Sequence, residues 1–162
     1  MVGDRYFPSI RRLAEYEVWC NATVFRKAAA LDQAELRQRF PFGFGTIHAT
    51  LFHIANVLRT WSSCVGPEIV RPDPLPYDPQ APLDAIARLN DELSAAFLAA
   101  IDRSHAAGLL ERDRRIEQVF HLVTHGTHHR TQVITMLRLL GKDPPLEAGD
   151  FGGWSRPSIV PK

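Results

Sequence analysis

Histidines are concentrated in one stretch of the chain, and their spacing suits the binding of a metal ion. Four of the seven histidines lie within nine residues, in the segment His121-Leu-Val-Thr-His125-Gly-Thr-His128-His129-Arg-Thr-Gln. His121, His125 and His129 are each four residues apart, which on an α-helix places neighbouring members of the series on one face. Two imidazoles one turn apart can bind the same transition-metal ion, because each offers a neutral nitrogen lone pair. This segment therefore predicts two ligands of a metal site.

A further ligand has to come from another helix, and His53 is the best candidate. It lies among apolar residues in Thr-Leu-Phe-His53-Ile-Ala-Asn, in the middle of a predicted helix. His48 precedes it by five residues and points about 140° away around a helix, so the two cannot share one ion. His105 falls at a predicted helix end, where we expect it to be solvated. Spacing alone leaves open whether His53 is joined by His121 and His125 or by His125 and His129.

Neighbours of the histidines narrow the chemistry. Gly126 stands where zinc proteases of the His-Glu-x-x-His type carry their catalytic glutamate, which disfavours a metalloprotease. Gln132 falls within about 20° of the direction of His125 on a helix, so we expect it beside the site. Arg130 points about 140° away from His125, and we expect it to face another helix or solvent rather than substrate.

The elements that must position these residues are helices. Apolar residues recur at intervals of three and four over the segments 9–30, 46–64, 83–104 and 115–140, with a short helical turn at 32–38. Ser9 and Thr46 are the expected N-caps, and Gly141 followed by Pro144 ends the last segment. Six prolines between residues 66 and 82 exclude a continuous helix there. The pattern predicts one all-α domain over residues 1–162: a four-helix bundle with a long Pro-rich crossover loop between the second and third helices, and an extended tail packed over it.

Composition excludes several classes of function. The net charge is +1, with 23% charged and 45% hydrophobic residues, and basic and acidic side chains are interleaved along the chain. Neither a nucleic-acid footprint nor a membrane-surface patch is therefore expected. Cys20 and Cys64 do not make a disulfide framework and are expected to be reduced thiols. With no apolar run suited to a signal peptide or a membrane span, we expect a cytoplasmic protein.

Three motifs resemble those of a known family: Tyr16-Glu-Val-Trp19-Cys-Asn21, then Gly45-Thr-Ile-His48-Ala-Thr-Leu-Phe-His53 with Trp61 eight residues on, and finally the histidine segment followed by Leu137-Arg-Leu-Leu-Gly141. Together they cover most of the chain, and the third is the most specific. On these motifs the chain resembles the DinB family of damage-inducible-type, metal-binding four-helix bundles.

The resemblance implies a site for one divalent ion, zinc or nickel. It selects as ligands the residues that match the family's histidines, which here are His53, His125 and His129. Two positions depart from the family pattern. Thr131 stands where a glycine is usual, and Leu58 stands where an acidic residue often occurs, five residues after the second-helix ligand. The second departure removes a possible polar partner of the site while leaving the three histidines intact.

Three functions remain open at this point. Three neutral ligands leave coordination positions for water or substrate, which is typical of a catalytic site. Some relatives in the wider superfamily use low-molecular-weight thiols, so the resemblance implies a metal-dependent enzyme of the thiol S-transferase type acting on a small electrophile. The alternatives are a hydrolase that uses metal-bound hydroxide and a non-catalytic metal-binding stress protein. Family members often dimerise, which implies a homodimer.

Overall fold

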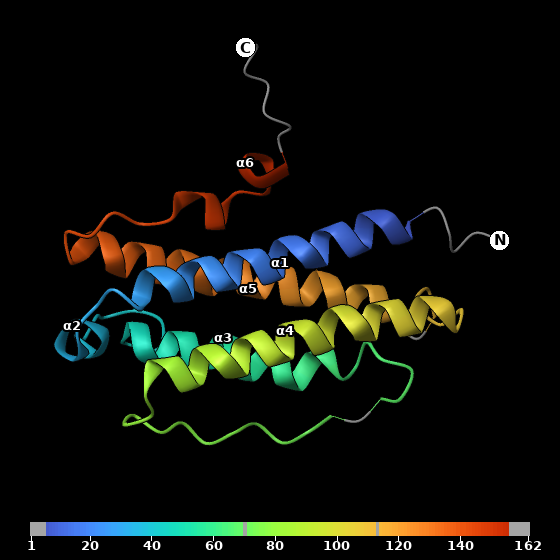
Figure 1. Cartoon of the computed structure of the whole chain (residues 1–162), viewed down its shortest axis with the longest axis horizontal. Coiled ribbons are helices and arrows are strands. Elements are labelled where there is room, and N and C mark those ends of the chain that lie inside the picture. Colours follow the sequence, from blue (N-terminus) through green and yellow to red (C-terminus); the bar gives the residue numbers. More distant parts are fainter. Residues whose placement is uncertain (1–5, 70, 113, 156–162) are drawn as a thin grey trace, which may run out of the picture.

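The chain folds into a bundle of helices (Figure 1). The computed structural model describes residues 6–69, 71–112 and 114–155, and this part of the chain contains no strand. Its elements are α1 (Phe7–Ala28), α2 (Gln33–Arg37), α3 (Ile47–Ser62), α4 (Leu83–Ala106), α5 (Arg115–Leu139), the 3-10 helix η1 (Leu146–Gly149) and α6 (Phe151–Ser155). The prediction of an all-α four-helix bundle is confirmed. Within the described residues, every helix is too short or too polar to span a lipid bilayer.

The four long helices form the bundle in an order that requires a crossover. α1 and α3 each pack against both α4 and α5. Figure 1 shows α3 and α4 running in the same direction, opposite to α1 and α5. A chain that leaves the end of α3 must therefore travel back along the bundle before α4 can begin, and the described residues 63–69 and 71–82 lie on this return.

The returning segment is held against α3 by side chains spaced along that helix. His48 is buried and bonds through Nε2 to the carbonyl of Ala81 and through Nδ1 to the hydroxyl of Tyr77, both at 2.8 Å. Asn56 exchanges two hydrogen bonds with the backbone of Leu75, at 2.9 and 3.1 Å. Three of these four hydrogen bonds use backbone groups of an extended segment that has no helical partners of its own.

Helix ends agree with the expected caps at some positions and differ at others. The side chain of Thr46 accepts a hydrogen bond from the backbone N–H of Ala49, as a predicted N-cap should. Ser9 is not a cap, because α1 begins earlier, at Phe7, with Pro8 in its first turn and no side-chain cap. Proline favours the first turn since its missing N–H would have no helical partner there. Gly141 follows α5 with a φ of +71°, a conformation in which glycine has no steric cost.

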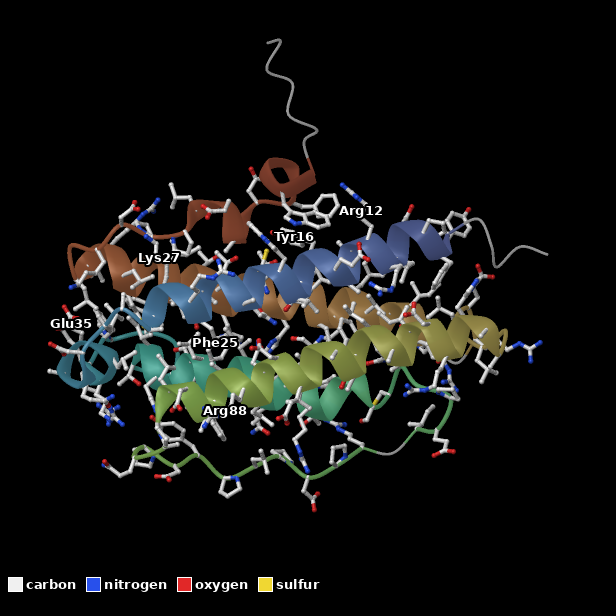
Figure 2. All side chains as sticks on the ribbon, viewed as in Figure 1. Arg12, Tyr16, Phe25, Lys27, Glu35 and Arg88 are labelled. Carbon is white, nitrogen blue, oxygen red and sulfur yellow. The ribbon has the colours of Figure 1, made fainter. Side chains whose placement is uncertain are left out.

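The expectation of an extended tail is wrong for the described residues, which form η1 and α6. Aromatic packing explains the helical turn, because the ring of Tyr16 on α1 meets Phe151 at 5.0 Å and Trp154 at 5.7 Å between centroids. The guanidinium of Arg12 lies 4.8 Å from the Trp154 ring. Figure 2 shows Arg12 and Tyr16 on the side of α1 that faces this segment. The tail beyond residue 155 lies outside the described residues.

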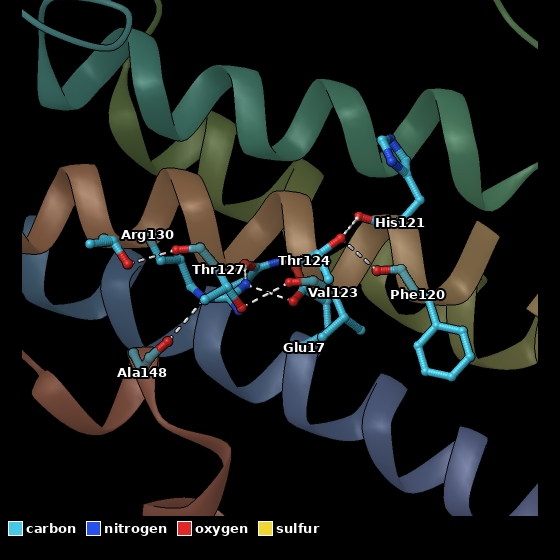
Figure 3. Close-up of polar contacts among 10 residues, drawn as sticks. Glu17, Phe120, His121, Val123, Thr124, Thr127, Arg130 and Ala148 are labelled. Carbon is cyan, nitrogen blue, oxygen red and sulfur yellow. Dashed lines mark hydrogen bonds and ion pairs between the residues drawn. The ribbon is translucent and has the colours of Figure 1, made fainter. Parts of the chain in front are cut away.

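A buried ion pair joins α5 to α1. Nη1 of Arg130 lies 2.7 Å from Oε2 of Glu17, and the side chains are 0% and 3% exposed. The same nitrogen donates to Oδ1 of Asn21 at 2.8 Å, and Nε donates to the carbonyl of Ala148 at 3.0 Å. Figure 3 shows Arg130 reaching from α5 toward Glu17 on one side and Ala148 on the other. Arg130 therefore faces another helix, in agreement with the direction expected from its position after His125.

The ion pair between Glu17 and Arg130 requires a glycine at residue 126. A Cβ atom at residue 126 would overlap Oε1 of Glu17. The absent side chain makes room for the carboxylate between the two helices. Burial raises the pKa of Glu17 above its ordinary value, against the charge and hydrogen bonds of Arg130 and the hydrogen bond of Asn21, which lower it.

We predict that Gly126→Ala lowers the free energy of unfolding by about 2 kcal/mol or more, since overpacking a buried contact typically costs 1–3 kcal/mol. Urea denaturation followed by circular dichroism measures this change. Thr131→Ala, on the exposed side of α5, is the control and should change stability by less than about 0.5 kcal/mol. Equal stability of the two variants would show that Glu17 does not occupy the space beside residue 126.

Candidate metal centre

Three histidines converge where α3 packs against α5. The ligating atoms of His53, His125 and His129 all lie within 4.8 Å of one another. Nε2 of His53 is 3.2 Å from Nε2 of His125, and the ring of His53 lies 4.5 Å from that of His129 between centroids. The 3.2 Å separation suits two nitrogens that share one ion at the 2.0–2.1 Å bond length of zinc and imidazole. These are the three residues that the family resemblance selects as ligands.

Helical periodicity places the three rings at the margin of the core. On α3 the buried positions Leu51, Ile54 and Ala55 lie in the main hydrophobic core, and His53 is only half-buried beside them. On α5 His129 is 8% exposed, while His125, one turn earlier, is half-buried. The site is thus shielded by the bundle on one side and reachable from the other.

Burial keeps these imidazoles neutral. Desolvation lowers the pKa of His53 from 6.5 to about 4, helped by the charge of His129. Desolvation, followed by the charges of the neighbouring histidines, lowers the pKa of His125 from 6.5 to about 3. The pKa of His129 is lowered as well, mainly by desolvation. Neutral imidazole is the form that binds metal, so the site is prepared for a cation at neutral pH.

The fourth histidine of the helical stripe lies beside the cluster and outside it. The ring of His121 is 5.5 Å from that of His125 and 4.6 Å from that of Trp61. The guanidinium of Arg71 lies over the Trp61 ring, 4.4 Å from its centroid. The structure therefore brings together His53, His125 and His129 rather than a set that includes His121.

An aromatic ring on a turn covers the opposite end of the site. Phe44 stacks on His53 with 4.0 Å between centroids and lies 5.4 Å from His129. It is 45% exposed and is flanked by Gly43 and Gly45, whose φ angles are +58° and +79°. Two left-handed glycines let the chain turn sharply enough to place this ring over the histidines.

The remaining candidate residues lie outside the histidine cluster and contact other parts of the fold. His48 binds the crossover segment, and His105 is half-buried and stacks on Phe7 with 3.7 Å between centroids, so it is less solvated than expected. Cys20 is buried, which raises the pKa of its thiol to about 11, and Cys64 is half-buried. Leu58 is 2% exposed and packs in the second hydrophobic cluster. The acidic position of the family is thus replaced here by an apolar contact.

Sequence reasoning missed two residues that shape this region. Glu17 lies within the first family motif, and a charged residue four positions before Asn21 on a largely apolar helix face was the available signal. Phe44 gave a weaker signal, because its place over the site depends on the path of the turn rather than on helical spacing.

Comparison with known families agrees with the all-helical fold. The model of the DinB family matches residues 6–151, which is most of the chain. No curated protein matched the chain with significance. The chain belongs to the DinB family, and its three-histidine cluster is compatible with metal binding.

We predict that the metal-free protein loses stability as the pH falls from about 6.5 toward 4. Both His53 and His125 have a lower pKa in the folded state than the ordinary value of 6.5, so the unfolded chain binds more protons and acid favours unfolding. The slope for each histidine is at most about 1.4 kcal/mol per pH unit, and solvent screening reduces it.

Urea denaturation of chelator-treated protein at several pH values measures this slope. His125→Gln should show a shallower dependence than the parent between pH 6.5 and 4, because glutamine does not titrate. Identical slopes for the two proteins would contradict the lowered pKa of His125.

Proposed function

We propose that His53, His125 and His129 bind one divalent transition-metal ion through their Nε2 atoms. The support is the convergence of three neutral imidazoles from two helices within 4.8 Å. Imidazole suits zinc, nickel, copper and iron, and the resemblance to the family favours zinc or nickel. Because the three donors are uncharged, the ion would keep its full positive charge and at least one position for another ligand.

The first test is elemental analysis of untagged protein and three single variants. We expect about one ion per chain in the parent, as three histidines around one centre provide. His53→Ala and His129→Ala should each weaken binding by more than about 100-fold, because losing only the partner of a ligand already costs 10–100-fold. His121→Ala, which removes a histidine one turn from His125, is the matched control and should keep the metal.

The variants also separate the alternatives that spacing left open. Loss of metal in His121→Ala with retention in His129→Ala would replace the proposed ligand set with the other pair. Retention in His53→Ala would remove α3 from the site.

We further propose that the protein is a metal-dependent enzyme of the thiol S-transferase type that acts on a small electrophile. When bound, a divalent ion supplies a lowered pKa for a coordinated thiol, which makes it a nucleophile near neutral pH. The sulfur would form a bond to carbon of the electrophile as the leaving group departs with the electron pair, and the thiol proton would pass to solvent. This transfer needs no carboxylate base in the protein.

The surroundings of the histidines favour this reaction over hydrolysis. Among the described residues, no hydrogen bond or ion pair joins a carboxylate to His53, His125 or His129, whereas hydrolysis commonly uses a carboxylate as general base. The position where the family often has an acid is the buried Leu58. Phe44, which is 45% exposed, offers an aromatic surface at one end of the site on which the apolar part of an electrophile can pack, and the half-buried Trp61 lies beside His121 at the other end.

The second test measures thiol consumption by the metal-loaded protein with a chromogenic electrophile and a panel of low-molecular-weight thiols. We expect the parent and His121→Ala to exceed the uncatalysed rate and His53→Ala to fall to it. Phe44→Ala should raise KM more than it lowers kcat if the ring packs on substrate. Full metal content without turnover on any thiol would favour the non-catalytic stress protein, and turnover of esters alone would favour the hydrolase.

Two proposals concern the setting of the protein. Its cysteines are free, with Cys20 buried, which supports the cytoplasm, where thiols stay reduced. The homodimer is proposed on the resemblance to the family alone. Light scattering after gel filtration distinguishes a dimer from a monomer.

A further inference from the structure

Gln132 connects two histidines through the two ends of its amide group. Its Oε1 lies 2.9 Å from Nδ1 of His129, and its Nε2 lies 3.0 Å from Nε2 of His128. All three residues are on α5, where positions three and four apart are neighbours. The amide is therefore a bridge between a buried candidate ligand and an exposed histidine.

The bridge determines where the proton of His129 lies. A side-chain carbonyl oxygen has no hydrogen and can only accept, so Nδ1 of His129 must donate. In a neutral imidazole the other nitrogen, Nε2, then carries the lone pair. At the other end of the amide the N–H group can only donate, so Nε2 of His128 is the acceptor.

The turn that carries Phe44 also packs against this amide. A Cβ atom on Gly43 would lie only 2.6 Å from Oε1 of Gln132, and Gly43 has a φ of +58°. Glycine thus allows the backbone to approach the amide closely and limits the positions that the side chain can take.

His129 differs from the other two histidines of the cluster in having this partner. Among the described residues no hydrogen bond reaches Nδ1 of His53 or of His125. Histidines that bind metals usually donate their second N–H to an acceptor, which fixes the tautomer and the direction of the ring. Within the described part of the site, only His129 is held in this way before a cation arrives.

We propose that Gln132 is a positioning residue that holds His129 as the Nδ1–H tautomer, with Nε2 directed toward His53 and His125, so that metal affinity depends on an acceptor at residue 132. The proposal rests on the proposed metal site. Under this proposal His129 is the one of the three ligands whose tautomer and ring orientation are fixed before metal binds.

The first experiment measures zinc affinity by competition with a chromophoric chelator. Gln132→Leu removes the acceptor and should weaken binding by about 10–100-fold. Gln132→Glu keeps an oxygen acceptor and should bind zinc at least as tightly as the parent. Thr135→Val removes another side-chain hydrogen bond of α5, from Oγ1 to the carbonyl of Thr131, and is the control that should bind like the parent.

Two outcomes of this experiment would overturn the proposal. One is an affinity of Gln132→Leu within about twofold of the parent, far from the cost expected for losing such a partner. The other is equal weakening in Gln132→Leu and Gln132→Glu, which would show that the acceptor oxygen is not the feature that matters.

The second experiment needs no variant and no metal. Nitrogen-15 chemical shifts of the histidine rings in the metal-free parent at neutral pH identify which nitrogen of His129 carries the proton. We expect Nδ1, and a proton on Nε2 would overturn the proposal even if every variant failed to fold. A parent that shows the expected tautomer but binds no zinc would disprove the metal site and leave the hydrogen-bond assignment standing.

Discussion

The buried ion pair between Arg130 and Glu17 is the constraint on which the rest of the structure depends. Residues 129 and 130 are adjacent on α5, so their side chains point about 100° apart. When Arg130 is directed toward α1, His129 is necessarily directed toward α3. Replacing buried ion pairs with apolar residues often costs no stability, but a charged pair with several hydrogen bonds tolerates few alternative arrangements. Here the ion pair fixes the rotation of α5 about its own axis.

The crossover segment likewise fixes the rotation of α3 about its axis. His48 and Asn56 are occupied by backbone groups of residues 75–81 on one side of that helix, and His53 lies on another, toward α5. Because α3 and α4 run in parallel, the long return is unavoidable, and the structure uses it as a partner for polar residues that would otherwise be buried without one. Both helices that supply histidines are therefore fixed in rotation by contacts that do not touch the cluster itself.

Predictions from the sequence agree with the structure where the deciding contacts are between residues close in the chain. The spans of α3, α4 and α5, the Thr46 cap and the turn at Gly141 follow from residues close in sequence, and they were predicted well. The start of α1 was not, because proline in the first turn replaced the cap expected at Ser9. The tail was also misjudged, since its helical turns depend on packing against Tyr16, more than a hundred residues away in the chain.

The sequence by itself determined that the protein is helical, that His125 and His129 share a face of one helix, and that His53 lies on another. Helical spacing carries that information, because it depends only on backbone geometry. It could not decide between His121 and His129 as the companion of His125, and the choice needed either the family resemblance or the tertiary contacts. Only the packing of α3 against α5 decided which rings meet, because the distance between two helices is set by side chains far apart in the chain.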